Sequence, residues 1–311
     1  MEVSSNNSVL RSSVSSFLLP TNLSLTKKIT LLPVSASSSL LSNAIRSELS
    51  LCVGTHNIPH PNKIERGGED AFFISSYGGG TIAVADGVSG WAELDVDPAL
   101  FSKEFMANAS SMVEDEEVNN DPQALLRKAH AATSSVGSAT VIIAMMETNG
   151  ILNIANVGDC GLRVIRKGQV MFSTCPQEHY FDCPYQLSSQ SSGQTYLDAM
   201  VSSVKLKEGD IVVMGSDGLF DNVFDQEIAS TVVSNSDVTE AAKALARLAR
   251  DHSIDSNFDS PYSSEARTKG IEPPSWKKIL GMNLTGGKLD DITVVVGEVV
   301  KLAETTSEWV Y

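Results

Sequence analysis

Short apolar runs that end in an acidic residue constrain the fold of this chain more than any other feature. The run 81–85 consists of small apolar and β-branched residues and stops at Asp86 and Gly87, a pair that favours a turn. A second apolar run, 211–215, leads to another aspartate–glycine pair at Asp217. Each run has the length and composition of a buried strand, so each would deliver one carboxylate to the edge of a sheet.

Two further apolar runs begin with acids instead of ending in them. Glu69 and Asp70 precede one run, and Asp290 and Asp291 precede the other. Aspartate is common at surface turns, so turn chemistry alone explains any one of these residues. Four acid-tipped strands in one chain are harder to explain that way, because an unpaired buried carboxylate is costly. The pattern therefore predicts one cation site that the strand ends share.

The candidate ligands all offer oxygen, which points to Mg²⁺ or Mn²⁺ and away from zinc. Two such ions roughly 3.5–4 Å apart can activate a water molecule and hold a phosphoryl oxygen, which suits hydrolysis of phosphate monoesters. The chain has neither the Gly-x-x-x-x-Gly-Lys loop of many NTPases nor the Gly-x-Ser-x-Gly motif of many hydrolases. Asp159 and Asp221, also near apolar runs, extend the candidate set.

The composition excludes several other classes of protein. A formal net charge of −15 argues against nucleic-acid binding, which needs basic patches. No apolar run approaches the roughly 20 residues of a transmembrane helix. Cys175, His179 and Cys183 are spaced like weak zinc ligands, but prolines lie among them, so idle thiols in a reducing compartment are the better interpretation.

The first fifty residues differ from the rest of this acidic chain. They are rich in serine, threonine and leucine, and no acid lies between Glu2 and Glu48. This composition is typical of an organellar transit peptide, and its serine-rich, arginine-poor balance favours the chloroplast. An ordinary disordered tail is the alternative. We therefore expect a transit peptide at 1–50, a folded domain at 51–300 and a short tail at 301–311.

The folded part predicts an α+β protein with antiparallel sheets. Asn149 with Gly150 marks a hairpin turn between apolar runs, and Lys167 with Gly168 marks another, so consecutive strands should pair. The segment 253–287 is polar and rich in proline, glycine and serine, which predicts a long loop. Helical spacing and N-cap signals predict two pairs of helices, at 97–113 with 121–134 and at 225–233 with 238–252.

Six motifs stand in the order found in metal-dependent protein phosphatases of the 2C type, which the chain resembles from about residue 52 to 300. They are RGGEDA (66–71), ADGVSGW (85–91), GSAT (137–140), NVGD (156–159), GSDGLFD (215–221) and DDITV (290–294). The resemblance implies a four-layer αββα sandwich, two antiparallel sheets flanked by helix pairs. It also implies hydrolysis of phosphoserine and phosphothreonine in proteins, by a water that bridges two Mg²⁺ or Mn²⁺ ions.

The resemblance assigns a role to each acid at the strand ends. Asp86 would bridge both ions, and Asp217 with Asp290 would complete one of them, so these three are the expected catalytic residues, acting through metal-bound water. Glu69 and the carbonyl of Gly87 would serve the other ion.

Three further acids complete the metal set that the resemblance implies. Asp70 would lie just behind the ligands, while Asp159 and Asp221 match positions associated with a third, weaker ion. The chain departs from the family where Val88 replaces a histidine that many members carry, which removes a candidate proton donor.

The basic residue that contacts phosphate is also displaced. Glu65 occupies the position where the family usually has an arginine, so Arg66 or Lys63 would have to serve. The segment 253–287 corresponds to a variable flap, and its basic residues would contact the phosphoprotein. They are Arg267, Lys269, Lys277 and Lys278.

Within the family the chain resembles the plant organellar branch, which implies phosphoprotein substrates in the chloroplast. Photosystem II core proteins at the stromal face of thylakoids are the expected partners, with the enzyme a stromal monomer. Two alternatives stay open: a catalytically silent module of the same fold that regulates a partner, and a phosphatase of small phosphate esters. The missing histidine and displaced arginine favour the first, whereas the intact set of acids favours an active enzyme.

Overall fold

The structure, a computed structural model, describes residues 48–273, 275 and 283–302, all within the compact unit Ile45–Tyr311. The predicted transit peptide lies outside the described residues except for 48–50, and only 301 and 302 of the predicted tail are described. Strand β1 begins at Leu49, two residues before the expected start of the domain. Among the described residues, no helix is both long and apolar enough to cross a membrane.

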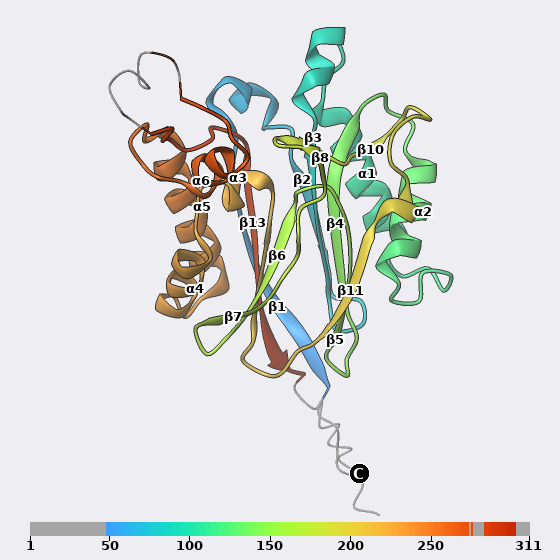
Figure 1. The fold of residues 1–311 in the computed structure, drawn as a ribbon. Coiled ribbons are helices and arrows are strands. Elements are labelled where there is room, and N and C mark those ends of the chain that lie inside the picture. Colours follow the sequence, from blue (N-terminus) through green and yellow to red (C-terminus); the bar gives the residue numbers. More distant parts are fainter. Residues whose placement is uncertain (1–47, 274, 276–282, 303–311) are drawn as a thin grey trace, which may run out of the picture. The chain divides into compact units, whose positions relative to one another are not determined.

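Two antiparallel sheets form the centre of the fold (Figure 1). In order, the first contains β1 (Leu49–Ile58), β13 (Ile292–Lys301), β12 (Ile211–Gly215), β6 (Gly161–Arg166) and β7 (Gln169–Ser173). The second contains β11 (Met200–Lys205), β5 (Ile151–Val157), β4 (Ser138–Met146), β3 (Thr81–Gly87) and β2 (Ala71–Ser75), with β10 (Leu187–Ser188) also on β4. A separate small hairpin joins β8 (Glu178–Tyr180) to β9 (Cys183–Pro184).

Helix pairs cover the outer face of each sheet, which confirms the predicted α+β sandwich of four layers. Helices α1 (Ala99–Met112) and α2 (Pro122–Ala132) pack on the second sheet, and α4 (Asp225–Ser234) and α5 (Val238–Ile254) pack on the first. Shorter helices are α3 (Asp217–Phe220), α6 (Pro261–Thr268) and the 3₁₀ turns η1 (Pro61–Arg66), η2 (Ser89–Leu94) and η3 (Tyr196–Asp198).

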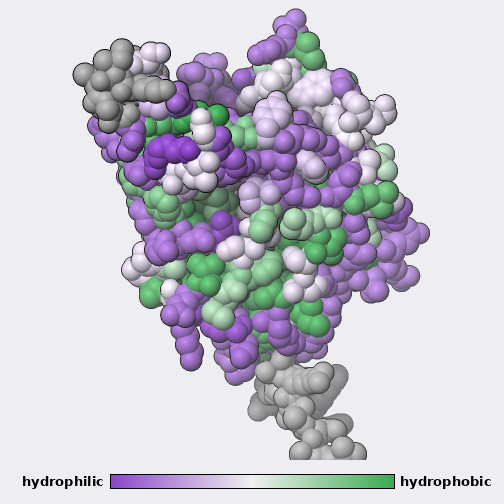
Figure 2. Space-filling model, viewed as in Figure 1, coloured by the Kyte–Doolittle hydropathy of each residue, from purple (hydrophilic) through white to green (hydrophobic). Residues whose placement is uncertain are grey.

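Strand β3 shows why the central runs are apolar throughout. Ile82 and Val84 point into the core between the two sheets, whereas Ala83 and Ala85 pack under the α1 and α2 layer. Successive side chains point to opposite faces, so a strand covered on both faces needs apolar residues at every position. Figure 2 shows a largely hydrophilic surface on the viewed face, with hydrophobic side chains gathered over its lower half.

The register of the strands brings the acid-tipped ends to one edge. Strands β2 and β3 are antiparallel, with Ala71 opposite Ala85, so the start of β2 lies beside the end of β3. Strands β12 and β13 are also antiparallel, with Gly215 opposite Val294, so the end of β12 lies beside the start of β13. The hydroxyl of Ser216, just past β12, donates to Asp70, just before β2, at 2.8 Å, so the acidic tips of the two sheets lie side by side.

The structure differs from the sequence-based expectation in the segment 253–287. We predicted a loop there, but α5 continues to Ile254 and α6 forms at Pro261–Thr268. Ser260 caps α6 by accepting a hydrogen bond from the Ser263 backbone, and proline occupies its first position. The polar composition concealed this helix, because α6 buries only Ser263 and Ala266 and carries no apolar stripe.

Candidate active site

Four acids converge where the two sheets meet. Asp86 lies near the end of β3, Asp217 opens α3 just past β12, and Asp290 precedes β13. The carboxyl groups of Asp86 and Asp217 are close enough for a proton held on Asp86 to lower the pKa of Asp217. Glu69, 1% exposed, precedes β2, and its backbone carbonyl accepts a hydrogen bond from the N–H of Gly87 at 3.2 Å.

Burial and mutual repulsion make it costly to ionise these carboxylates together. Burial raises the pKa of Asp86 well above its usual value, and the charges of Asp70, Asp217 and Asp290 raise it further. Burial, followed by the charge of Asp291, raises the pKa of Asp70 to about 7. Burial and the charge of Asp217 raise that of Asp290 to about 6. Carboxylates assembled at such an electrostatic cost are characteristic of functional sites, where a cation relieves the repulsion.

Glycine is required beside both of the key aspartates. A Cβ on Gly87 would lie 2.6 Å from the Pro98 carbonyl oxygen and 2.8 Å from that of Glu69. A Cβ on Gly218 would lie 2.0 Å from the carbonyl oxygen of Asp291. The two aspartate–glycine pairs are therefore places of close backbone packing as well as turns.

Asp291 holds the loop before β2 against the start of β13. It is 1% exposed and accepts hydrogen bonds from the backbone N–H groups of His60 at 2.7 Å and Glu69 at 3.0 Å. The Nζ of Lys63 lies 3.2 Å from the same carboxylate. Asp291 thus positions Glu69 by accepting a hydrogen bond from its backbone N–H. The sequence motif alone did not show that Asp290 and Asp291 have different roles.

Lys63 and Arg66, the two candidates for a phosphate contact, are placed differently. The Nζ of Lys63 lies 2.7 Å from Glu69 and 3.4 Å from Asp290. Burial alone would lower the pKa of Lys63, but the hydrogen bond to Glu69 and the nearby aspartates raise it. Arg66 is looser: its guanidinium is 44% exposed and lies 3.6 Å from Glu69 and 3.7 Å from Asp97.

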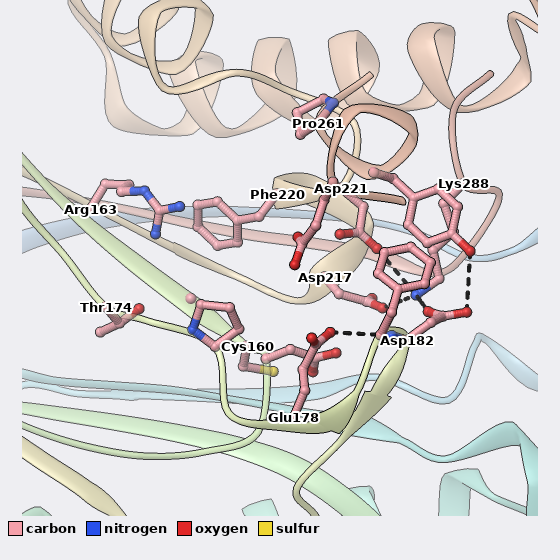
Figure 3. A pocket seen from close by; sticks show the side chains of 16 residues that line it. Cys160, Arg163, Thr174, Glu178, Asp182, Asp217, Phe220, Asp221, Pro261 and Lys288 are labelled. Carbon is pink, nitrogen blue, oxygen red and sulfur yellow. Dashed lines mark hydrogen bonds and ion pairs between the residues drawn. The ribbon is translucent and has the colours of Figure 1, made fainter. Parts of the chain in front are cut away.

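A second cluster of charge surrounds Lys288 (Figure 3). Its Nζ lies 2.6 Å from Asp217, 2.8 Å from Asp182 and 3.1 Å from Asp221. The pKa of Asp217 is lowered on balance. Burial alone would raise this pKa, but the charge of Lys288 and its hydrogen bond to the carboxylate outweigh that effect. For Asp221, burial outweighs the lysine and raises the pKa to about 7. Burial, with the charges of Asp217 and Asp221, also raises the pKa of Asp159 well above its usual value.

The acids fit a hard cation in chemistry. One carboxylate oxygen (Oδ1) on each of Asp70, Asp159 and Asp217 is buried without a hydrogen-bond partner, and such acceptors need a partner. The donors around them are carboxylates, the preferred ligands of Mg²⁺ and Mn²⁺. Among the described residues, however, no three acidic, histidine or cysteine side chains already surround one point as a formed set of ligands. The ammonium groups of Lys63 and Lys288 lie between these carboxylates.

A cavity of about 240 Å³ opens beside these acids. Asp159, Asp217, Asp221 and Lys288 line it. Figure 3 shows Asp217 and Asp221 next to Lys288 in its wall. The aromatic rings that line it are Phe181 on the β8–β9 hairpin, Phe220 on α3 and Tyr262 on α6. Its volume lies below the roughly 300–1,000 Å³ of pockets that enclose small ligands, which favours a substrate group presented on a larger molecule.

Several other sequence-based expectations can be located in the structure. Val88 precedes η2, and its side chain offers no proton donor. Arg267 forms an ion pair with Asp259, and Lys269 forms ion pairs with Glu178 and Glu265. Both of these basic residues of the segment 253–287 are therefore paired with acids of the same chain. Lys277 and Lys278 lie outside the described residues.

Lys288 and Asn222 were absent from the sequence-based candidates. The side chain of Asn222, which is fully buried, donates a hydrogen bond to the Lys288 carbonyl and accepts one from the Lys288 N–H. These two bonds place the lysine beside the acids. The available signal was weak: Lys288 precedes the Asp290 motif by two residues.

Comparison with known proteins gives consistent matches over the folded part. No family model matches the chain. The chain is 69% identical over 256 residues to "Probable protein phosphatase 2C 1" of Oryza sativa subsp. japonica, covering 82% of this chain and 77% of that protein.

Two solved structures are similar in fold. The "X-ray structure of the photosystem II phosphatase PBCP" matches with a TM-score of 0.79 and 68% identity, over 81% of this chain and 100% of that one. The catalytic domain of the serine/threonine protein phosphatase PstP, solved with 2 manganese ions, matches with a TM-score of 0.55 at 20% identity, over 81% of this chain and 100% of that one. The second likeness concerns the fold alone.

Proposed function

The chain belongs to the protein phosphatase 2C family, and we propose that it dephosphorylates phosphoserine and phosphothreonine in chloroplast proteins, with photosystem II core proteins as substrates. The 68% identity to PBCP, a photosystem II phosphatase, supports this choice of substrate. The first fifty residues are rich in serine and contain no acid between Glu2 and Glu48, which supports localisation in the chloroplast stroma.

The observation that carries the proposal is the convergence of acid-tipped strands at one sheet edge. Asp86 lies beside Asp217, whose pKa it lowers, and Asp290 is close enough to raise the pKa of Asp86. We assign Asp86, Asp217 and Asp290, with Glu69 and the Gly87 carbonyl, to a pair of Mg²⁺ or Mn²⁺ ions. The bound ions would supply Lewis acidity toward the phosphoryl group and water.

The other residues of the site position these ligands and the substrate. Asp70 accepts a hydrogen bond from the Ser216 hydroxyl at 2.8 Å, which joins the start of β2 to the end of β12 behind the ligands. Arg66 is the better candidate for the phosphate contact, because its exposed guanidinium makes only long ion pairs while Lys63 is held by three carboxylates. A bidentate guanidinium suits a phosphoryl group.

The proposal is tested by phosphate release from three substrates: a threonine-phosphorylated peptide, phosphorylated thylakoid membranes and a small aryl phosphate. The full chain is assayed with EDTA, Mg²⁺ or Mn²⁺. We expect metal-dependent release from the peptide and membranes, and loss of at least about 10²-fold in Asp217→Asn, the scale of removing one preorganised charge-stabilising group. Asp237→Asn is the matched control, because Asp237 only caps α5.

The outcomes separate the parts of the proposal. Release from the aryl phosphate alone would overturn the assignment of protein substrates. Release from the peptide without release of phosphate from photosystem II core proteins in the membranes would overturn the photosystem II assignment and keep the phosphatase. No release with either metal, from folded protein, would support the silent module.

A further inference from the structure

Lys288 occupies the centre of an acidic cluster beside the proposed catalytic ions. Its ammonium contacts three carboxylates within 3.1 Å, those of Asp217, Asp182 and Asp221. Asp159 lies close enough for the lysine charge to stabilise its ionised form, and its Oδ1 is buried without a partner. One lysine therefore acts on four carboxylates, three of them by direct contact.

The backbone around Lys288 fixes where the ammonium can go. The Lys288 N–H donates to the Asn222 side-chain oxygen at 2.9 Å, and the Asn222 amide donates to the Lys288 carbonyl at 2.8 Å. Asn222 is itself held, because His252 contacts its carbonyl through Nδ1 at 2.8 Å. A Cβ on Gly287 would lie 2.3 Å from the His252 carbonyl oxygen, so only glycine allows this approach.

We propose that Lys288 is a tethered cation that takes the place of a third metal ion among Asp159, Asp217 and Asp221. The ammonium lies among Asp182, Asp217 and Asp221, where it occupies the position that an ion bound between Asp217 and Asp221 would need. The tethered group also costs no association entropy. The inference rests on the proposed function, and it revises the sequence-based expectation that Asp159 and Asp221 bind an ion. The protein would then hold two ions of the proposed site and no third.

The same contact links the cluster to the hairpin and to α6. Asp182, at the turn of the β8–β9 hairpin, accepts from Lys288 through one oxygen and lies 3.3 Å from the Tyr262 hydroxyl through the other. Phe181 beside it packs on the Tyr262 ring, with centroids 5.1 Å apart. The ammonium of Lys288 therefore also helps to hold the β8–β9 hairpin against α6, two elements that form parts of the cavity wall. A metal ion that exchanges with solvent would hold them only while it is bound.

The test counts bound Mn²⁺ by equilibrium dialysis, with free Mn²⁺ read by electron paramagnetic resonance. The full-length wild type, Lys288→Met, and Lys288→Met with Asp221→Asn are compared. Lys269→Met is the matched control, because Lys269 pairs with Glu178 and Glu265 on the same side of the molecule. We expect two ions in the wild type and control, a third in Lys288→Met bound at least about tenfold more tightly than any further ion in the wild type, and two in the double variant.

Each result decides between the possibilities. A third tightly bound ion in the wild type would overturn the inference, and this measurement does not depend on whether a variant folds. Two ions in folded Lys288→Met, with no gain in affinity for a third, would overturn it as well. A wild type that binds no Mn²⁺ would instead contradict the proposed function.

Discussion

Removing the Asp291 carboxylate should destabilise the fold strongly without removing any proposed metal ligand. Asp291→Ala leaves the backbone N–H groups of His60 and Glu69 without their acceptor in a region where Asp291 is 1% exposed. An unsatisfied buried donor costs about 1–3 kcal/mol, so the buried N–H of Glu69 and the partly buried N–H of His60 together cost about 2–5 kcal/mol. Lys63 keeps Glu69 and Asp290, so its charge stays paired.

One effect opposes this loss. The Asp291 charge contributes to the raised pKa of Asp70, so the substitution relieves some repulsion in the metal-free protein. Allowing about 1 kcal/mol for that relief, one pKa unit being about 1.4 kcal/mol, we expect a net loss of about 3 kcal/mol. This is a large part of the ~5–15 kcal/mol that stabilises a typical domain.

Urea unfolding in EDTA, followed by circular dichroism, measures this loss as a fall in the midpoint at unchanged slope. Thermal unfolding should show a fall of about 6–12 °C, at ~2–4 °C per kcal/mol for a domain of this size. Asp255→Ala is the control, because the exposed carboxylate of Asp255 accepts a single backbone hydrogen bond among the described residues, from Asn257. A loss below about 1 kcal/mol in Asp291→Ala would show that the loop does not depend on this carboxylate.

Three further predictions follow from particular contacts. The raised pKa of Asp70, about 7, means that the folded protein keeps a proton which the unfolded chain releases above about pH 4. In EDTA the free energy of unfolding should therefore fall as pH rises from 4 to 7, and Asp70→Asn should flatten that fall; an unchanged slope would refute the assignment. Gly218→Ala should cost several kcal/mol in urea unfolding while Gly90→Ala, in open space, costs less than about 1. Arg66→Ala should raise the KM for a phosphopeptide about tenfold or more, as loss of a charged hydrogen bond implies, and an unchanged kcat/KM would remove Arg66 from the phosphate contact.

The strand ends and their acids were predictable because the signals are local. Each aspartate–glycine pair follows an apolar run in the sequence, and the hairpin turn at Gly150, with φ 88°, adopts the conformation that glycine favours. Once the strands are antiparallel, register brings the tips of β2 and β3 together in one sheet and those of β12 and β13 together in the other. The packing of the two sheets, which the sequence does not show, then brings the two pairs of tips together.

The supporting contacts could not be predicted because they join distant parts of the chain. Asp291 bonds the backbone of Glu69, 222 positions away, and nothing near either residue indicates that pairing. Lys288 acts through its contact with Asp182, 106 positions away, and through the clamp by Asn222. Such roles depend on which loops meet at the sheet edge, which is a property of the assembled fold.

If the acid-tipped strands hold a pair of divalent cations, anomalous X-ray scattering from crystals grown with Mn²⁺ should reveal them. We expect two manganese peaks at the sheet edge, with Asp86 next to both and Asp217, Asp290 and Glu69 around them. Crystals of Asp86→Asn should lose at least one peak. Manganese peaks elsewhere, or none at this edge in the wild type, would contradict the account.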